Sequence, residues 1–193
     1  MDRWSRFAEQ LDDDIGLRWG GNVTYCSDPD EGRRLASECE RLNSWGYSAR
    51  LISLEELSSL EPNLKIGQFH TGIYTREEGH VLPVKVAEAC MDKIQEAGGK
   101  AFLNTLVDSI TQSGDKVFLR LDDEEMEFDQ VVIAAGIDST KLAKTAGINL
   151  PQRRSPGVVV KTKPLPSFIH SLATIYLPPI SKEEKEIHIR QDI

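Results

Sequence analysis

Val131-Val132-Ile133-Ala134-Ala135-Gly136 is the stretch of sequence that decides the fold. A run of five apolar residues ending in glycine is typical of a strand that is covered on both faces, as strands in parallel sheets are. Asp138 then stands where a helix would be capped, and Gly147 where that helix would end. A buried parallel strand that leads directly into a helix predicts an α/β fold.

The residues upstream of this strand predict a helix followed by a β-meander. Pro83 begins the helix and Gly98-Gly99 end it, with an apolar stripe formed by Ala87, Cys90, Met91, Ile94 and Ala97. From Lys100 the apolar period changes from the helical value to two residues. We therefore expect short strands, separated by turns, over residues 101–103, 105–111, 116–121 and 125–128.

The N-terminal part of the chain alternates strands and helices. Gly20-Gly21 interrupts a strand predicted over residues 17–25, which indicates a bulge or a close backbone approach. Asp28 caps a helix, and Ser53 opens a second, short helix that stops near Glu61-Pro62 because the residue before proline avoids the helical region. The first of these helices has an apolar face formed by Leu35, Cys39, Leu42 and Gly46.

Further strands are expected over residues 68–75, 158–161 and 187–190. The strands and helices together predict a mixed α/β (α+β) fold with two lobes that are interleaved in the sequence. We expect residues 76–150 to belong to one lobe. Residues 11–75 and 151–193 are expected to build the other lobe, of which the second part, 151–193, is expected to be truncated.

The composition excludes several classes of function. The formal net charge of −8 makes nucleic acid an unlikely partner, because it provides no field that gathers phosphates. The apolar runs are far shorter than a membrane span, and the N-terminus lacks a secretory signal, so we expect a cytoplasmic protein. The three cysteines, Cys26, Cys39 and Cys90, are widely spaced and predict buried free thiols rather than a metal site or a disulfide framework.

The order of the motifs resembles the D-amino-acid oxidase family of flavoproteins, which includes glycine oxidase and sarcosine oxidase. The central part of the resemblance is carried by residues 79–83 (Gly-His-Val-Leu-Pro), 97–101 (Ala-Gly-Gly-Lys-Ala) and 131–136. Upstream, residues 54–57 (Leu-Glu-Glu-Leu) and 60–62 (Leu-Glu-Pro) look like the stretch that precedes the family's substrate domain. Downstream, residues 150–151 and 154–157 look like its domain crossover.

The resemblance implies FAD as the cofactor and assigns roles to a few residues. Residues 76–150 would form part of a Rossmann-like FAD-binding lobe with a β-meander, and the other lobe would be a β-rich substrate lobe. Ala134, Ala135 and Gly136 would line the FAD, and the backbone of Val107 would hydrogen-bond adenine. A tight strand-to-helix turn and a core valine are the alternative interpretations of these positions.

The sequence departs from the family pattern at two places. Leu82 stands where the family usually has an acidic residue. The Gly-x-Gly-x-x-Gly motif, whose helix N-terminus and close backbone approach hold the FAD pyrophosphate, is missing. We therefore interpret the chain as an internal fragment of a longer protein, and we expect the chain by itself to bind FAD weakly or not at all.

The intact protein is expected to oxidise a small amine or amino acid by hydride transfer to the flavin, after which water hydrolyses the imine. The redox chemistry would reside in the flavin. The main alternative is a non-catalytic scaffold or interaction domain, derived from a flavoprotein, that has lost the cofactor half. A nicotinamide-dependent dehydrogenase fits less well, because the dinucleotide fingerprint is absent for that cofactor too.

No side chain is assigned a catalytic role from the sequence. The histidines, His70, His80, His170 and His188, show no spacing typical of a site, although His80 lies near the domain crossover. An arginine with a neighbouring tyrosine could clamp a substrate carboxylate, which makes candidates of Arg18, Tyr25, Tyr74 and Arg76. Arg153 and Arg154 are expected to be surface charges.

Overall fold

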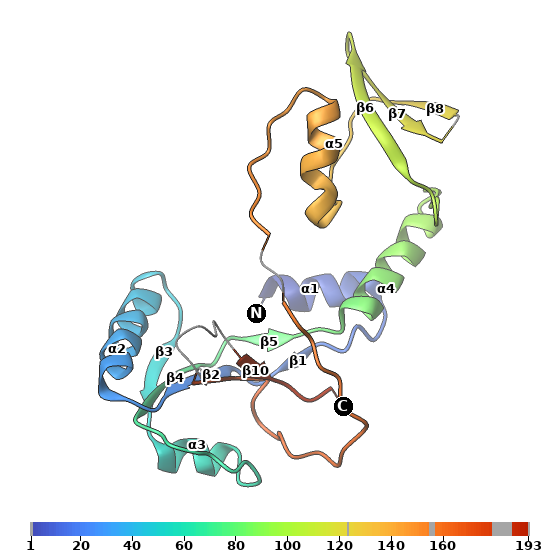
Figure 1. The fold of residues 1–193 in the computed structure, drawn as a ribbon. Helices are drawn as coiled ribbons and strands as arrows, with labels where there is room; N and C mark the ends of the chain where they lie inside the picture. Colours follow the sequence, from blue (N-terminus) through green and yellow to red (C-terminus); the bar gives the residue numbers. More distant parts are fainter. Residues whose placement is uncertain (1, 123, 155–156, 179–186, 193) are drawn as a thin grey trace. The chain divides into compact units, whose positions relative to one another are not determined.

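The computed structural model describes residues 2–122, 124–154, 157–178 and 187–192. The chain forms two compact units, of which the first combines Met1–Gly99 with Lys163–Ile193 and the second is Lys100–Thr162 (Figure 1). The two units are described one after the other.

A five-stranded sheet is the centre of the first unit, with the strand order β10-β9-β2-β4-β3. The central strand β2 pairs antiparallel with β4 and parallel with β9. Strand β9 therefore joins the N-terminal and C-terminal parts of the unit in one sheet. The strands are β2 (Asn22–Cys26), β3 (Ala49–Ile52), β4 (Thr71–Thr75), β9 (Thr174–Leu177) and β10 (Ile187–Ile189).

A short antiparallel ribbon precedes this sheet, formed by β1 (Arg18–Trp19) and β5 (Gly79–His80). Gly20-Gly21 separates β1 from β2, as the interrupted pattern predicts. A Cβ atom on Gly20 would lie 2.1 Å from the carbonyl oxygen of Ser171, so only glycine allows this approach. The close backbone approach expected from the sequence is confirmed.

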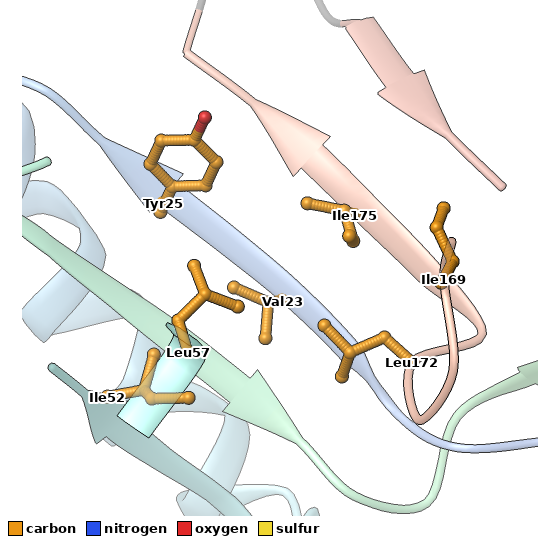
Figure 2. Packing of buried hydrophobic residues seen from close by; sticks show 7 residues of the cluster. All are labelled: Val23, Tyr25, Ile52, Leu57, Ile169, Leu172 and Ile175. Carbon is orange, nitrogen blue, oxygen red and sulfur yellow. The ribbon is translucent and has the colours of Figure 1, made fainter. Parts of the chain in front are cut away.

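Two helices cover opposite faces of the sheet, α2 (Pro29–Ser44) and α3 (Leu54–Leu60). Side chains alternate between the faces of a strand, so Val23 and its neighbours face α3 while Ile73 faces α2. Figure 2 shows the larger cluster, on the α3 side, which contains Val23, Tyr25, Ile52, Leu57, Ile169, Leu172 and Ile175. The cluster on the α2 side contains Cys39, Ala49 and Ile73, with Leu35 and Leu42 against it.

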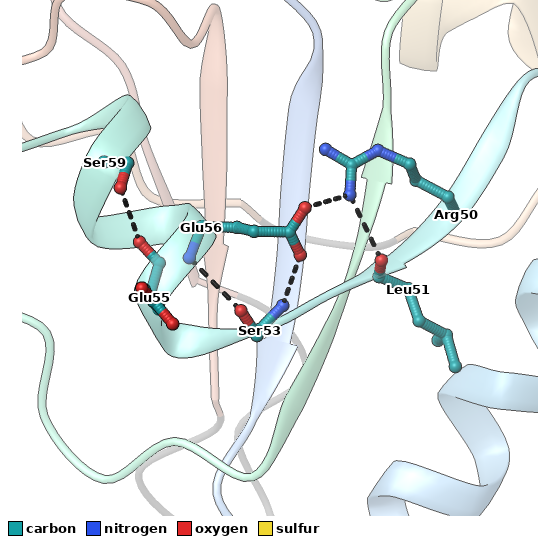
Figure 3. A network of polar contacts seen from close by, with 6 residues as sticks. All are labelled: Arg50, Leu51, Ser53, Glu55, Glu56 and Ser59. Atoms are coloured by element: carbon teal, nitrogen blue, oxygen red, sulfur yellow. Dashed lines mark hydrogen bonds and ion pairs between the residues drawn. The ribbon is translucent and has the colours of Figure 1, made fainter.

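The helix caps predicted from the sequence are present in this unit. Asp28 accepts hydrogen bonds from the backbone nitrogens of Asp30 and Glu31. At α3, Ser53 Oγ accepts from Glu56 N at 3.2 Å, and Glu56 Oε2 accepts from Ser53 N at 3.0 Å (Figure 3). The Ser53 backbone amide, and after it Arg50, holds the pKa of Glu56 below its usual value. These bonds fix the first turn of α3. They thereby set the direction of the helix axis and the place where the helix ends.

Helices α1 (Asp2–Leu11) and α4 (Pro83–Glu96) pack together around Leu11, Ile15 and Ala89. Helix α1 was not expected, since this stretch reads as turn-rich. The stripe predicted for α4 is wrong in part: Cys90 packs against the cluster, but Ala87 and Ile94 are exposed. The physical reason is that α1 covers the side of α4 that carries Val86, Ala89 and Cys90.

The second unit contains the predicted meander and one helix. Strands β6 (Val107–Ser113), β7 (Lys116–Leu121) and β8 (Glu124–Phe128) form an antiparallel sheet in chain order. A short 3₁₀ turn, η1 (Gly136–Asp138), leads into helix α5 (Ser139–Thr145). Ile110 N donates to Thr145 Oγ1 at 2.9 Å, which ties this helix to β6.

Three predicted strands are not formed, over residues 101–103, 131–135 and 158–161. Most of their apolar side chains face solvent: Val132 is 89% exposed and Val159 is 94% exposed. A strand is stabilised by its neighbours, and no described residues pair with these segments. Asp138 also fails to cap α5 with its side chain. Conversely β9 was missed, although its Thr-Ile-Tyr-Leu run has high β-propensity.

Replacing Asp28 by alanine tests the cap of α2. Asp28→Ala removes the acceptor for two backbone amides and should lower the free energy of unfolding by about 1 kcal/mol. Asp28→Asn keeps a side-chain oxygen and should lower the free energy of unfolding much less. Urea unfolding followed by circular dichroism measures both variants, and equal stability of Asp28→Ala and the parent protein would contradict the assignment.

Candidate functional site

A buried carboxylate organises the loop that enters β9. Glu61, at the end of α3, is fully buried, and its two oxygens accept three backbone hydrogen bonds. The donors are the amides of His170 at 2.7 Å, Ser171 at 2.7 Å and Leu172 at 2.6 Å. A buried charge is tolerated when it is fully hydrogen-bonded, and here the loop backbone provides those bonds. Glu61 thus fixes the loop to the end of α3.

Two further side chains hold the same loop. Arg18 donates to the carbonyl oxygens of Ile169 at 3.1 Å, His170 at 2.9 Å and Gln191 at 3.2 Å. The amide group of Gln191 accepts from Phe168 N and Ile169 N. The loop before β9 is therefore held by groups from β1, from α3 and from the residues after β10.

His80 lies beside this loop on the β1–β5 ribbon. Its side chain is only 8% exposed, and Nδ1 is 3.0 Å from the carbonyl oxygen of Ala173. This contact requires a hydrogen on Nδ1, since a carbonyl oxygen can only accept. Burial lowers the pKa of His80, which favours the neutral ring, although the Ala173 contact opposes the shift. In the neutral ring Nε2 is then an acceptor, and it lies 3.9 Å from Asp192 Oδ1.

A hollow of about 300 Å³ adjoins His80 and Arg18. Its walls combine one buried imidazole, a guanidinium, a carboxylate and apolar groups, so it offers both polar and apolar contacts to a small molecule. The lining residues are Gly16, Leu17, Arg18, His80, Leu82 and Asp192.

The residues predicted to line FAD all lie in the second unit. Val107 begins β6 and pairs with Leu121, whereas Ala134 and Ala135 lie outside the three-stranded sheet and Gly136 begins η1. The structure therefore brings Ala134, Ala135 and Gly136 together as one exposed segment, and it places Val107 in a different element.

The segment at Gly136 suits the approach of a flat cofactor. Gly136 has φ +56°, and no atom lies within 4 Å of the position a Cβ would take. Ala134 and Ala135 are small and exposed, so the backbone there is accessible. The Gly136 carbonyl accepts a hydrogen bond from Gln152 Nε2 at 3.1 Å, which holds the turn. The exposed backbone here leaves room for a ligand, while the sequence has no glycine-rich motif for the pyrophosphate.

The carboxylate-clamp candidates are mostly engaged elsewhere. Arg18 binds backbone carbonyls, and Tyr25 is buried and stacked on Phe69 with ring centroids 5.5 Å apart. The guanidinium of Arg50 lies 5.2 Å from the Tyr74 ring centroid, and Arg76 is exposed. The arginine beside Tyr74 is therefore Arg50, which also pairs with Glu56, and among the described residues no hydrogen bond or ring contact joins Arg18 or Arg76 to either tyrosine.

The other histidines occupy structural positions. His170 Nε2 contacts Asn63 Nδ2 at 2.7 Å, and the His188 ring lies 5.3 Å from that of Tyr176. The ring of His70 packs beside Gly32. Within the described part of the chain, no group of three or more His, Cys, Asp or Glu side chains could hold a metal ion.

Glu61 is the residue that sequence reasoning did not single out. It appears there only at the predicted end of a helix and as part of a Leu-Glu-Pro motif. The available signal is a glutamate that directly follows a short helix and precedes a proline. Its partners are backbone amides, which carry no sequence signature.

The family of the chain follows from its match to a family profile. The profile described as FAD dependent oxidoreductase (DAO) covers residues 1–193, the whole chain. The chain belongs to this family. The resemblance found in the order of the sequence motifs is thereby confirmed, and FAD is the cofactor of the family.

Known proteins are similar to this chain in sequence and in fold. One of the opine oxidase subunits from Agrobacterium tumefaciens (strain Ach5) is 27% identical over 168 residues, which are 83% of this chain and 45% of that protein. Glycine oxidase from Geobacillus kaustophilus matches with a TM-score of 0.71 and 22% identity, over 77% of this chain and 41% of that one. L-proline dehydrogenase from P. horikoshii matches with a TM-score of 0.67 and 20% identity, over 76% and 39%.

These similarities bear on the fold and on the length of the chain. The structural likenesses confirm the predicted mixed α/β fold. The chain spans about half the length of the curated relatives it matches. None of the helices in the described ranges is both long and apolar enough to cross a membrane.

Substituting Glu61 tests the clamp on the loop before β9. In Glu61→Gln the side-chain NH₂ faces backbone amides, so at least one buried donor loses its partner. We expect a loss of about 3 kcal/mol in urea unfolding, together with faster hydrogen exchange of the amides of residues 170–172. Glu55→Gln, at an exposed position of the same helix, is the control and should change neither quantity. Unchanged exchange in Glu61→Gln would refute the clamp.

The buried imidazole of His80 should make folding stability depend on pH. Its pKa is lower in the folded protein than the usual value of about 6.5, so the unfolded chain binds the proton more readily. The contribution of the neutral His80 ring to stability is therefore fully present above about pH 6.5, and it is lost as the pH falls from there through the lower pKa of the folded protein. The charged groups that face the ring are Arg18, Arg190 and Asp192.

The variant His80→Asn keeps a donor near the Nδ1 position without the titration. We expect the melting temperature of the parent protein to fall more between about pH 8 and about pH 5.5 than that of the variant. Parallel pH dependence of the two proteins in thermal melts would show that His80 makes no such contribution.

Proposed function

We propose that the whole protein is an FAD-dependent oxidoreductase that oxidises an amine or an amino acid. The observation that carries the proposal is the family match over residues 1–193. The names of three similar proteins also mention an opine, glycine and L-proline. In each of these names the compound is an amine or an amino acid. When bound, FAD would accept a hydride from the carbon that bears the nitrogen, and water would hydrolyse the resulting imine.

The roles of the two lobes follow from the sequence assignment. Residues 76–150 would belong to the FAD lobe, where Gly136, Ala134 and Ala135 present accessible backbone to the flavin and Val107 hydrogen-bonds adenine. Residues 11–75 and 151–193 would build the substrate lobe, in which Glu61 and Arg18 keep the sheet in place. The protein's own contribution would be to bind and orient the substrate, and a cytoplasmic location stays a prediction.

The chain itself would be a piece of the intact enzyme. The largely exposed run of residues 131–135 supports this interpretation, because a parallel strand of the FAD lobe needs neighbours that the described residues do not provide. The same exposure, with the missing pyrophosphate motif, favours the alternative of a cofactor-free scaffold. The coding sequence upstream of this chain distinguishes the enzyme from the scaffold, because only the enzyme requires a strand followed by Gly-x-Gly-x-x-Gly there.

The test is a titration with FAD of this chain and of a version extended by its upstream reading frame. We expect the extended protein to be yellow and to be bleached by a secondary amine or an amino acid under anaerobic conditions, while the short chain stays nearly colourless. A protein that is not stabilised by FAD in either form, and that no amine reduces, would overturn the proposal in favour of a scaffold.

A pair of glycine variants locates the flavin. In the extended protein, Gly136→Ala should weaken FAD binding about tenfold, since a Cβ would stand where the cofactor approaches. Gly147→Ala is the matched control, because Gly147 also has positive φ and open space around it, and its variant suffers similar backbone strain. Equal FAD affinity of the two variants would remove Gly136 from the site.

A further inference from the structure

Strand β3 lies at an edge of the five-stranded sheet in the first unit. Strand β4 pairs with one side of it, and no strand in the described ranges pairs with the other side. An edge strand presents unpaired backbone N–H and C=O groups, to which a strand of another molecule can add. The sequence of β3, Ala-Arg-Leu-Ile, contains no proline that would stop such pairing. The groups that occupy the free side of β3 therefore decide whether the sheet can extend there.

The backbone groups of Ala49 and Leu51 point away from β4. In an antiparallel pair, successive residues direct their N–H and C=O groups alternately toward the partner strand and away from it. The N–H of Ala49 donates to Tyr47 O at 3.0 Å, outside the ladder, so Ala49 is one of the outward residues. Leu51 and Ser53 follow at a spacing of two residues, and their backbone groups therefore point to the same side.

The carboxamide of Asn43, in the last turn of α2, takes the place of a neighbouring strand at Ala49. Asn43 Oδ1 accepts from Ala49 N at 3.2 Å, and Asn43 Nδ2 donates to Ala49 O at 2.8 Å. These are the two bonds that a residue of an antiparallel strand would make with Ala49. Asn43 Nδ2 also lies 3.0 Å from Cys39 O, to which it donates, and this bond holds the side chain against its own helix.

Two charged side chains hold the next outward groups (Figure 3). Arg50 Nη1 donates to Leu51 O at 3.3 Å and to Glu56 Oε1 at 2.8 Å. Glu56 Oε2 in turn accepts from Ser53 N at 3.0 Å. Among the outward N–H groups of Ala49, Leu51 and Ser53, only that of Leu51 has no acceptor in the part of the chain that the structure describes. The free side of β3 is thus almost completely occupied by side chains of the same unit.

We propose that Asn43, Arg50 and Glu56 close the β3 edge against the β3 strand of a second copy of the protein. Exposed apolar side chains flank this edge, since Trp45 is 64% exposed and Leu51 is 47% exposed. Two β3 strands related by a two-fold axis would pair antiparallel and would bring these apolar groups together. The N–H and C=O of Leu51 would then bond the same groups of the other copy, and the bonds made by Asn43 and Arg50 would be lost.

Amide hydrogen exchange of the full chain, resolved by NMR, tests the closure without any substitution. Relative to unstructured peptides, we expect the amides of Ala49 and Ser53 to be slowed at least about tenfold more than that of Leu51, because only these two have acceptors. The exchange of Leu51 should not depend on protein concentration. A Leu51 amide as protected as that of Ala49, or one that slows as the concentration rises, would show that the edge is open to pairing and would overturn the proposal.

The variant Asn43→Ala opens the edge at Ala49. Alanine favours a helix more than asparagine does, so α2 should persist, which circular dichroism verifies. We expect the Ala49 amide to exchange about tenfold faster in dilute solution, and the Leu51 amide to slow as the concentration is raised, because a second copy adds at β3. Ser44→Ala is the matched control, since the Ser44 hydroxyl bonds Arg41 O within the same turn, and it should behave like the parent protein. Leu51 exchange that is independent of concentration in folded Asn43→Ala would refute the proposal.

A proline at position 51 tests whether this association occurs at β3. Since the N–H of Leu51 points outward, Leu51→Pro removes no bond to β4, and proline is tolerated on edge strands. Sedimentation velocity should show association of Asn43→Ala beyond that of the parent protein, and adding Leu51→Pro should abolish the excess. An excess that persists in the double variant would contradict pairing at β3. The test uses neither FAD nor an amine, so its outcome is independent of the proposed oxidoreductase function.

Discussion

The carboxylate of Glu61 is the constraint on which the first unit depends. It is fully buried, and the backbone amides of residues 170–172 satisfy it. Because the loop that it holds leads into β9, the same contact brings the C-terminal part of the chain beside β2. The Ser53 capping box fixes the start of α3, and Glu61 uses the end of that helix as an anchor. Local helix chemistry thus determines a pairing between strands far apart in the sequence.

The two units differ in how completely they cover their own apolar side chains. The first covers both faces of its central sheet with α2, α3 and the loop before β9. In the second, Val132 and the valines at 158–160 face solvent. Apolar side chains in such numbers are normally covered by other elements. The contrast agrees with the length of the matched relatives, less than half of which is aligned with this chain.

The sequence was sufficient wherever a local rule decides the structure. The caps at Asp28 and Ser53, the break at Gly20-Gly21 and the meander follow from side-chain chemistry and periodicity, and they were predicted. Residues 131–135 were predicted as a buried strand from composition, but burial depends on neighbouring strands that composition cannot provide. The role of Glu61 was missed because its partners are backbone amides.

Hydrogen exchange of residues 131–135 and 170–172 tests the central claim, that the first unit covers its own sheet while the second has apolar residues that the described residues leave uncovered. In this chain alone we expect slow exchange at residues 170–172 and fast exchange at residues 131–135. In the protein extended by its upstream reading frame and loaded with FAD, both segments should exchange slowly. Slow exchange of residues 131–135 in the chain alone, or fast exchange in the extended FAD-bound protein, would contradict the account.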